Sequence, residues 1–260
     1  MTFELEGKRA LVTGAGQGVG AAIARRVAAA GVDVLVNDLV VDRAEAVVEQ
    51  IRSAGGVAHP AAFDVTDRDA VRAGIESASG SGRIDILVNN AGNAGAEGFG
   101  GIGPFVESRP EQWQRFIDVN LYGVMHCAHA VLPKMIDAGW GRIINIVSDS
   151  ARTGDANMAA YAAAKAGAAG FGRGLASEVA RHGITVNSLA LGTMRTEMTE
   201  GFWADEANLE RQRAILSGYL VRRPGEPDDV AWMVAMLASP LAGWVTGQTI
   251  PVNGGASFAL

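Results

Sequence analysis

Short runs of hydrophobic residues alternate along the chain with longer segments in which hydrophobic positions recur at helical spacing. The short runs predict β-strands that are covered on both faces, because their side chains are hydrophobic on both sides of the strand. The longer segments predict amphipathic helices. We expect strands at residues 9–13, 32–37, 84–89, 142–147 and 184–189, weaker strands at 57–62 and 249–252, and helices at 20–30, 43–54 and 67–79.

The regular alternation of strands and helices indicates an α/β fold. A helix between two strands returns the chain to the same end of the sheet by a right-handed crossover, so neighbouring strands become parallel. We therefore expect a doubly wound parallel sheet with helices on both faces. No long linker or internal repeat interrupts the alternation, so residues 1–260 are expected to form a single domain.

Two segments depart from this alternation. Residues 195–220 lie between strand-like stretches and are richer in charged and aromatic residues. We expect them to form a peripheral helical lid, in which Phe202, Trp203 and Tyr219 either cover an apolar substrate or bury the lid against the core. The glycine-rich residues 95–103 are expected to form a mobile loop beside the substrate.

Charge and cysteine content narrow the range of partners and compartments. The net charge is -6 and no basic stripe is present, which argues against nucleic acid or an anionic membrane as a partner. No apolar stretch of about 18 residues could span a bilayer, and the N-terminus does not resemble a leader. The single cysteine, Cys127, cannot build a disulfide framework. These features predict a cytoplasmic protein.

A metal site is not expected. His126 and His129 are spaced for one helix face, but no acidic or cysteine ligand accompanies them in a recognised metal pattern. We interpret both as ordinary helix histidines. Cys127, which lies between them, is expected to be buried and inert.

A glycine-rich turn, TGAGQGVG at residues 13–20, follows the first predicted strand and opens the first predicted helix. Glycines let the chain turn tightly and let backbone N–H groups approach a pyrophosphate, and the helix N-terminus adds partial positive charge. The turn predicts a dinucleotide site of the Rossmann type, formed by Gly14, Gln17, Gly18, Val19 and Gly20. A glycine-rich turn without a ligand is the alternative.

Asp38 ends the second predicted strand, 20 residues after Gly18. A carboxylate at this distance binds the adenosine ribose hydroxyls and repels the additional phosphate of NADP. Gln17 and Leu39 offer no cation for that phosphate, and Arg43 lies further along on a predicted helix. Asp38 therefore favours NAD(H) over NADP(H), although a helix-capping or loop carboxylate is the alternative.

Tyr161 and Lys165 are spaced for one face of an alanine-rich helix. A neighbouring ammonium lowers the pKa of a tyrosine, and a tyrosine tuned toward neutral pH can exchange a proton with an alcohol or ketone oxygen. Ser148 follows a predicted strand and could donate a hydrogen bond to the same substrate oxygen. Ser150 competes for that role, and a surface Tyr/Lys pair is the alternative for the helix.

The order of these motifs along nearly the whole chain resembles the short-chain dehydrogenase/reductase family. Jointly they are far more specific than any one of them. The motifs are the glycine-rich turn, the acidic end of the second strand, Asp64-Val65, Asn89-Asn90-Ala91-Gly92, Asn120 in VNLYG, Ser148, Tyr161-x-x-x-Lys165, Asn187, Gly192, Thr196, RPGEPDDVA at 223–231 and VTGQTIPVNGG at 245–255.

The resemblance implies an NAD(P)-dependent oxidoreductase that interconverts a secondary alcohol and a ketone. Tyr161 would be the general acid/base, and Lys165 would lower its pKa and bind the nicotinamide ribose. Ser148 would polarise the substrate oxygen, and Asn120 would hold a water in the proton relay.

The same resemblance implies the remaining cofactor contacts. Asp64 and Val65 would lie by the adenine, and Gly192 would belong to the nicotinamide site. Thr196 would contact the nicotinamide carboxamide or the phosphates. The cofactor cleft would be lined by Asn90, Ala91 and Gly92, together with Tyr161 and Lys165.

Two positions depart from the family pattern. Leu191 stands where the family usually has proline before Gly192, and Asn253 stands where it usually has aspartate. Leu191 removes a fixed φ angle at the floor of the nicotinamide site, which puts the position of that loop in doubt. Neither change removes a catalytic group.

The substrate is indicated only by a local resemblance. The stretch Ser148-Asp-Ser-Ala-Arg152 is similar to that of family members that act on cyclic hydroxyacyl-CoA thioesters. We hypothesise a hydroxyacyl-CoA substrate, with 3-oxoacyl-carrier-protein reductase or a hydroxysteroid-type dehydrogenase as alternatives. A non-catalytic NAD(H)-sensing protein is the alternative of another class. Candidates for contacts with CoA phosphates, each of which is otherwise a surface arginine, are Arg152, Arg211, Arg213 and Arg222.

Gly167, Gly170 and Gly174 recur along the helix that carries Tyr161. Each glycine in a helix interior costs around 1 kcal/mol relative to alanine, so close approach of another helix would explain the pattern. Relatives form dimers or tetramers through helices at this place, and we expect a homotetramer or a homodimer.

Overall fold

The computed structural model describes residues 3–80, 82–92 and 103–258. Its centre is a seven-stranded sheet in the order β3-β2-β1-β4-β5-β6-β7, and every neighbouring pair is parallel. All seven predicted strands are present. Their bounds are β1 (Arg9–Val12), β2 (Asp33–Val36), β3 (Val57–Pro60), β4 (Ile86–Asn89), β5 (Gly141–Ser148), β6 (Ile184–Leu191) and β7 (Thr249–Val252).

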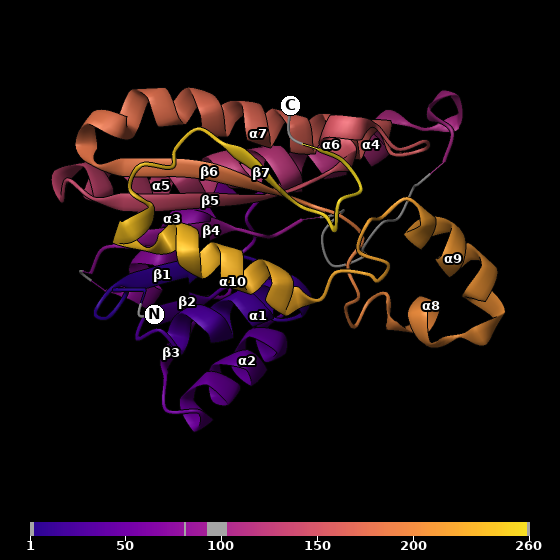
Figure 1. Ribbon diagram of the computed structural model, residues 1–260. Helices are drawn as coiled ribbons and strands as arrows, with labels where there is room; N and C mark the ends of the chain where they lie inside the picture. Colours follow the sequence, from indigo (N-terminus) through magenta and orange to yellow (C-terminus); the bar gives the residue numbers. More distant parts are fainter. Residues whose placement is uncertain (1–2, 81, 93–102, 259–260) are drawn as a thin grey trace.

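Helices cover both faces of the sheet, as Figure 1 shows. One layer contains α1 (Gly18–Ala28), α2 (Val41–Ser53) and α10 (Pro227–Ala238). The other contains α3 (Arg68–Ser79), α5 (Gly123–Asp137) and α7 (Ala159–Val179). The predicted single Rossmann-type domain is confirmed.

Alternation of side chains along each strand produces the two cores. In β1, Ala10 and Val12 pack in the cluster that includes Ile23 of α1, whereas Leu11 packs in the cluster that includes Met135 of α5. All of these side chains are fully buried. Because both faces of a parallel sheet are covered, functional groups are left to the ends of the strands.

Shorter elements complete the chain. They are α4 (Pro110–Ile117), a π-helical turn (Asp118–Tyr122), α6 (Ser150–Thr153), α8 (Glu200–Ala204), α9 (Leu209–Ser217) and 3-10 turns at Phe105–Glu107, Ala180–His182, Glu206–Asn208 and Pro240–Ala242. In Figure 1, α8 and α9 project beyond the end of the sheet. The segment predicted at 195–220 is therefore helical and peripheral.

Strand order reverses between β1 and β4, since β1 pairs with β2 on one side and with β4 on the other. In open α/β sheets, ligands bind outside the carboxyl ends of the strands at such a switch point. Among the described residues, no helix is both long and apolar enough to cross a membrane. The switch point between β1 and β4 therefore indicates a ligand site at the carboxyl ends of the strands.

Candidate active site

A cleft of about 850 Å³ opens along the carboxyl edge of the sheet. The residues that line it come from the loops after β1, β2, β3, β4, β5 and β6 and from the peripheral segment. Every predicted catalytic or cofactor-binding residue lines this cleft except Asn120, which is fully buried. The fold therefore brings together groups that are separated by more than a hundred residues in the sequence.

The glycine-rich turn is shaped by close backbone contacts. A Cβ atom on Gly20 would lie 2.3 Å from the carbonyl oxygen of Gly14 and 2.4 Å from Nδ2 of Asn90, so only glycine fits. Asn90 Nδ2 donates to the carbonyl oxygens of Thr13 and Gly14, both at 2.9 Å. Thr13 Oγ1 accepts from the backbone N–H groups of Asn90 and Ala91 at 3.0 Å. These bonds join the turn to the end of β4 and hold the N-terminus of α1 at the cleft.

One backbone donor of this turn is occupied by a side chain that the sequence did not single out. The N–H of Gly18 donates to Oε2 of Glu197 at 3.0 Å, across a separation of 179 residues. Glu197 lines the cleft. The sulfur of Met198, the next residue, accepts a hydrogen bond from Gln17 Nε2 at 3.4 Å. A pyrophosphate at the N-terminus of α1 would need the same donor. Binding of a dinucleotide therefore competes with Glu197.

Asp38 lies at the other end of the turn with its carboxylate held by the backbone. Oδ2 accepts from the N–H of Gly16 at 3.0 Å, and Oδ1 accepts from the N–H of Val40 at 2.9 Å. These contacts are those of a loop carboxylate, yet Asp38 also lines the cleft. Arg43 is on α2, as predicted, but it too lines the cleft, and a Cβ on Gly16 would lie 2.6 Å from Cβ of Arg43. Arg43 therefore lies on the predicted helix, and the fold brings that helix position next to the turn.

Tyr161, Lys165 and Ser148 meet where β5 ends and α7 begins. Lys165 is buried, and its Nζ donates to the carbonyl oxygen of Ile146 at 2.8 Å. The same Nζ lies 5.9 Å from the centre of the Tyr161 ring. Tyr161 is also buried, packs edge-on against Phe116, and has a hydrogen bond with Ser148. The predicted helix face and the strand end thus converge.

The expected lowering of the pKa of Tyr161 by Lys165 is not found. Burial raises the pKa of Tyr161 to about 12, the hydrogen bond with Ser148 opposes that rise, and Asp155 adds to it. Burial also lowers the pKa of Lys165 to about 8. Burial is the largest cause of both shifts, because desolvation disfavours each charged form.

Asn120 lies beneath the cleft in the π-helical turn Asp118–Tyr122. Its Nδ2 donates to the carbonyl oxygen of Phe116 at 2.8 Å. A Cβ on Gly92 would lie 3.2 Å from Asn120 Oδ1 and 3.1 Å from Lys165 Nζ. The polar atoms predicted to form a proton relay therefore face the same point, and the absence of a side chain on Gly92 leaves room there.

Ser150, the competing candidate, also lines the cleft and is hydrogen-bonded to Ser148. Ser148 Oγ donates to Ser150 Oγ at 3.1 Å, and the N–H of Ser150 donates back to Ser148 Oγ at 3.2 Å. Ser150 Oγ in turn donates to Oδ2 of Asp155, a residue that sequence analysis missed. Asp155 lines the cleft beside the predicted catalytic group.

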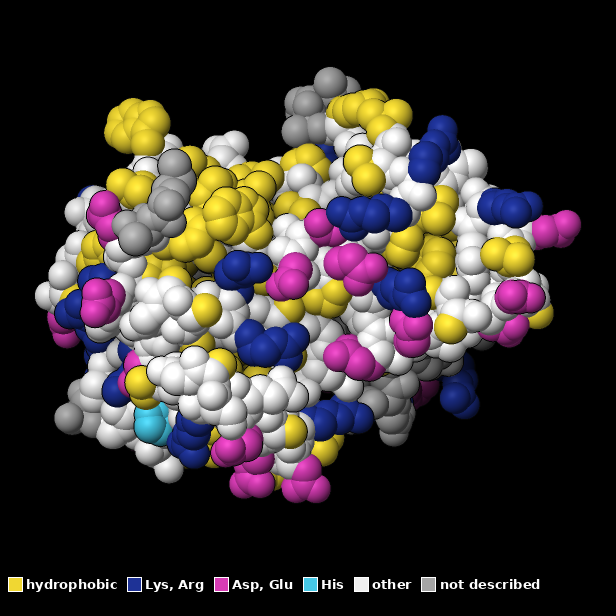
Figure 2. Space-filling model, turned by 60° about the horizontal axis from the view of Figure 1, so that its bottom comes forward, with side chains coloured by type: hydrophobic (Ala, Val, Ile, Leu, Met, Phe, Trp, Pro, Cys, Tyr) yellow, Lys and Arg dark blue, Asp and Glu magenta, His cyan; other side chains and the backbone are white. Residues whose placement is uncertain are grey.

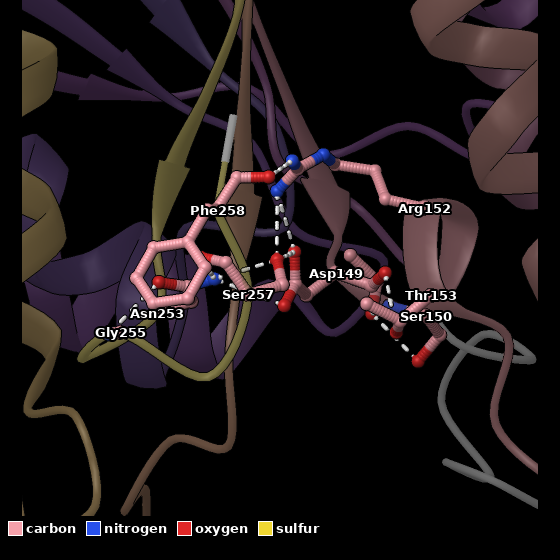
Figure 3. A network of polar contacts seen from close by, with 9 residues as sticks. Asp149, Ser150, Arg152, Thr153, Asn253, Gly255, Ser257 and Phe258 are labelled. Carbon is pink, nitrogen blue, oxygen red and sulfur yellow. Dashed lines mark hydrogen bonds and ion pairs between the residues drawn. The ribbon is translucent and has the colours of Figure 1, made fainter. Parts of the chain in front are cut away.

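The departure at Asn253 is explained by a buried polar network (Figure 3). Asn253 Nδ2 donates to Asp149 Oδ2 at 2.9 Å, and Arg152 Nη1 donates to Asp149 Oδ1 at 2.8 Å. Ser257 Oγ donates to Asp149 Oδ1 at 2.8 Å. An aspartate at position 253 would place two carboxylates in contact, which disfavours ionisation of both. The amide at 253 therefore matches the carboxylate at 149.

Leu191, the second departure, continues β6 two residues beyond the predicted end. It pairs with Ser148 of β5 and Val252 of β7, and its carbonyl oxygen accepts from the N–H of Asp149 at 2.9 Å. Gly192 follows, and its N–H donates to the carbonyl oxygen of Val252 at 3.3 Å. The loop is thus held by strand pairing where the family pattern has proline.

The arginines that were predicted to meet CoA phosphates do not line the cleft. Arg152 is part of the Asp149 network and also donates to the carbonyl oxygen of Phe258 at 2.6 Å. Arg222 donates to the carbonyl oxygens of Leu216 and Ser217. Arg211 lies 5.9 Å from the Phe202 ring centre. The predicted phosphate contacts find no support in these positions.

Of the predicted lid aromatics, Tyr219 alone lines the cleft. Its hydroxyl donates to Thr193 Oγ1 at 2.9 Å and accepts from the Thr193 N–H at 2.8 Å. Phe202 and Trp203 instead pack against each other edge to face, with ring centroids 5.0 Å apart. The glycine-rich loop predicted at 95–103 lies outside the described residues, apart from Gly103.

The histidines and the cysteine behave as expected of α5. Cys127 is fully buried, and burial raises the pKa of its thiol to about 12, which makes it unreactive. His126 Nδ1 contacts the carbonyl oxygen of Val65 at 3.0 Å. Within the described part of the chain, no group of three His, Cys, Asp or Glu residues could hold a metal ion.

Residues 8–207 match the sequence model of a family described as short chain dehydrogenase. The chain is 41% identical over 251 residues to the short-chain reductase protein NovJ of Streptomyces niveus, which covers 95% of this chain and 92% of that protein. The chain belongs to the short-chain dehydrogenase/reductase family. It is an oxidoreductase of the class that acts on a secondary alcohol or the matching ketone.

Other relatives differ in substrate. The chain is 35% identical to a 7alpha-hydroxysteroid dehydrogenase of Escherichia coli strain K12 (97% of this chain, 95% of that protein), and 38% identical to the 3-oxoacyl-[acyl-carrier-protein] reductase FabG of Vibrio harveyi (97% and 98%). A crystal structure of a gluconate 5-dehydrogenase from Burkholderia cenocepacia, in complex with NADP and tartrate, superposes with a TM-score of 0.88 at 35% identity and covers 100% of this chain and 98% of that one.

We expect the Lys165→Met substitution to stabilise the protein while it abolishes activity. The pKa of Lys165 in the folded protein lies below its ordinary value of 10.5, so protonation favours the unfolded chain. The full penalty, on the order of 3 kcal/mol, applies below pH 8 and disappears as the pH rises toward 10.5. Urea unfolding at pH 7 and pH 9.5 measures this difference.

In that experiment the gain from Lys165→Met should be larger at pH 7 than at pH 9.5. Lys134→Met is the matched control, because Lys134 is exposed and donates to the carbonyl oxygen of Gly82 at the surface. A Lys165→Met protein that is less stable than wild type at both pH values would contradict the assigned burial of charge.

We expect the Glu197→Gln substitution to strengthen cofactor binding. Glutamine keeps the shape of the side chain but removes the negative charge that shares the Gly18 N–H with an incoming pyrophosphate. Binding of NADH should tighten by about 3–10-fold, which corresponds to roughly 1 kcal/mol. Titration of the protein with NADH, followed by nicotinamide fluorescence, gives the dissociation constant. Glu206→Gln, on an exposed 3-10 turn, is the control, and equal affinity of Glu197→Gln and wild type would refute the competition.

Proposed function

We propose that this protein oxidises a secondary alcohol, or reduces the matching ketone, with NAD(H), and that its substrate is a hydroxyacyl or 3-oxoacyl thioester. The observation that carries the proposal is the meeting of Ser148, Tyr161 and Lys165 at one end of a cleft whose other end is the glycine-rich turn. The end with Ser148, Tyr161 and Lys165 suits the substrate, and the end with the glycine-rich turn suits the nicotinamide cofactor.

In this proposal Tyr161 transfers the proton and Ser148 holds the substrate oxygen. The Ser148 hydroxyl donates a hydrogen bond to that oxygen as negative charge develops on it, and releases its bond to Ser150 to do so. Tyr161 Oη takes the proton from an alcohol or returns it to the reduced ketone. The nicotinamide cofactor supplies the hydride acceptor or donor when it is bound.

Lys165 and Asn120 would connect Tyr161 with solvent. Lys165 Nζ has two protons in addition to the one that it donates to Ile146, and it faces Asn120 Oδ1 across the space above Gly92. A water between these groups would hydrogen-bond to both and pass on the proton that Tyr161 takes up. The same Lys165 ammonium would bind the ribose of the nicotinamide.

The preference for NAD(H) rests on Asp38. Its carboxylate is buried at the end of β2 and lines the cleft, where it would accept hydrogen bonds from ribose hydroxyls and repel a phosphate. Arg43 beside it works in the opposite direction, and the gluconate 5-dehydrogenase relative holds NADP. We propose that Asp38 outweighs Arg43, because the carboxylate is fixed by two backbone donors.

The thioester proposal takes its support from relatives, since FabG acts on a 3-oxoacyl group carried by a protein. The 7alpha-hydroxysteroid dehydrogenase supports the steroid alternative instead. Tyr219, Met194 and Ile215 give the substrate end of the cleft an apolar wall that fits an acyl chain or a ring system. A sugar acid would meet Asp155 at the same end, which disfavours a carboxylate there.

The enzymatic proposal is tested by the rate of absorbance change at the nicotinamide band. The panel contains hydroxyacyl-CoA esters, free secondary alcohols and hydroxysteroids, each with NAD and with NADP. Wild type should turn over at least one class, and Tyr161→Phe should lower kcat by about 10²–10⁴-fold, the usual contribution of a general acid/base. A Tyr161→Phe protein with wild-type kcat would contradict the role of Tyr161 and favour an NAD(H)-sensing protein.

Cofactor preference is tested by two opposite substitutions. Asp38→Asn keeps an acceptor for the backbone but removes the charge, and should raise kcat/KM for NADP relative to NAD by about 10–100-fold, the scale of one or two lost charge interactions. Arg43→Ala should change the same ratio in the other direction. If Asp38→Asn leaves the ratio unchanged, the preference does not come from this carboxylate.

We also propose a homo-oligomer, a tetramer or a dimer. A Cβ on Gly174 would meet nothing within 4 Å and one on Gly170 only Arg173 Nη2 at 3.8 Å, so packing within the described chain does not require these glycines. Gly167 differs, because a Cβ there would lie 3.2 Å from Leu121 Cδ2. A second copy against α7 would account for Gly170 and Gly174.

A second surface also favours association. Figure 2 shows hydrophobic side chains gathered in the upper left part of one face, while acidic and basic side chains are interspersed over the rest. The exposed hydrophobic residues on α10 and the segment after it are Trp232, Met236, Leu241 and Trp244, and Trp244 is 100% exposed. Apolar groups concentrated in this way mark interaction surfaces.

The oligomer is tested by light scattering at micromolar concentration. Wild type should have the mass of a dimer or tetramer, and Gly174→Glu, which has open space in the isolated chain, should lower the mass through loss of the α7 contact. Trp244→Ala tests the second surface in the same way. A monomeric mass for wild type would refute the proposal.

A further inference from the structure

The carboxylate of Asp155 is a charged group at the substrate end of the cleft that the proposed reaction does not use. Asp155 follows α6, is exposed, and lines the cleft together with Ser148, Ser150 and Tyr161. Oδ2 accepts a hydrogen bond from Ser150 Oγ, and no ion pair with a lysine, arginine or histidine is found for Asp155 among the described residues. Oδ1 is left for a ligand.

The position of Asp155 relative to the reacting group is set by one bridging hydroxyl. Ser150 Oγ donates to Asp155 and accepts from Ser148 Oγ at 3.1 Å. When Ser148 donates to a substrate oxygen, Ser150 stays beside it through the bond from the Ser150 N–H to Ser148 Oγ at 3.2 Å, and Ser150 Oγ still donates to Asp155. A cationic donor close to the carbinol is therefore the kind of group that the carboxylate of Asp155 would bind.

The other charges at this end are either paired or buried. Asp149 is paired with Arg152, and Asn253 covers its second oxygen. Lys165 is buried and bound to the carbonyl oxygen of Ile146. The exposed charge beside the substrate is therefore negative. Asp155 also adds to the rise in the pKa of Tyr161, after the larger effect of burial, so its field reaches the reacting atoms.

We propose that Asp155 is a specificity-determining residue that binds a protonated amine on the substrate, on the carbon next to the carbinol or ketone. The substrates favoured in this way are amino alcohols and amino ketones, including acyl groups that carry an amine at that carbon. A carboxylate at the same place is repelled. The inference rests on the proposed alcohol–ketone chemistry and assigns the group that the site selects beside the reacting carbon.

The test compares two alcohols that differ by one amine. Phenylpropanolamine has an ammonium on the carbon next to its benzylic alcohol, and 1-phenylpropan-1-ol has none. Each is assayed for kcat/KM with NAD and with NADP. Each is also titrated calorimetrically into the protein saturated with the oxidised cofactor, so that binding is measured whether or not turnover occurs.

Wild type should prefer the amine in both measurements. In Asp155→Asn, the ratio of amine to neutral alcohol should fall by about 10–100-fold, as expected for one partly exposed charge pair. Asp155→Glu should restore part of the preference. Glu76→Gln removes one exposed carboxylate on α3 and is the matched control for net charge. The ratio separates lost selectivity from general damage, which would lower both values together.

Three results overturn the inference. They are no binding of the amine by wild type, equal affinity for the two alcohols, and an Asp155→Asn protein that keeps the wild-type ratio. Failure of the proposed function has a different signature, since binding would keep its Asp155-dependent preference while the nicotinamide absorbance remained unchanged with every alcohol of the panel.

Discussion

The buried hydrogen bond from Lys165 Nζ to the carbonyl oxygen of Ile146 is the interaction on which the site depends. Ile146 lies two residues before Ser148 in β5, and Tyr161 lies one helical turn before Lys165 in α7. Because both elements are rigid, fixing Lys165 on the strand also fixes Tyr161 beside Ser148. The bond holds a charge out of water, and the lowered pKa of Lys165 records what that costs in stability.

Close to this bond, one departure from the family pattern, Asn253, fits the carboxylate beside it. Asn253 replaces a carboxylate and donates to Asp149, the residue that follows Ser148. Arg152 and Ser257 bind the other oxygen, so the end of β5 is joined to the segment after β7 (Figure 3). These contacts compensate the negative charge of Asp149. Asp155 is then the exposed carboxylate that a substrate would meet.

The elements and the placement of Tyr161 and Lys165 could be predicted from the sequence because they depend on local patterns. Seven buried runs gave seven parallel strands, and a spacing of four placed Tyr161 and Lys165 on one face. The contacts of Glu197 with Gly18 and of Arg43 with Gly16 could not be predicted in this way, because they depend on how distant loops meet in space. The pKa of Tyr161 was misjudged for a related reason, since burial is a tertiary property that spacing does not report.

Direct transfer of hydride from the carbinol carbon to the cofactor is the central claim, and isotope transfer tests it most directly. A secondary alcohol that wild type oxidises, deuterated at the carbinol carbon, is incubated with NAD and the reduced cofactor is analysed by mass spectrometry. The account predicts one deuterium in the reduced nicotinamide for each ketone formed. Deuterium released to water, or ketone formed without labelled cofactor, would contradict it.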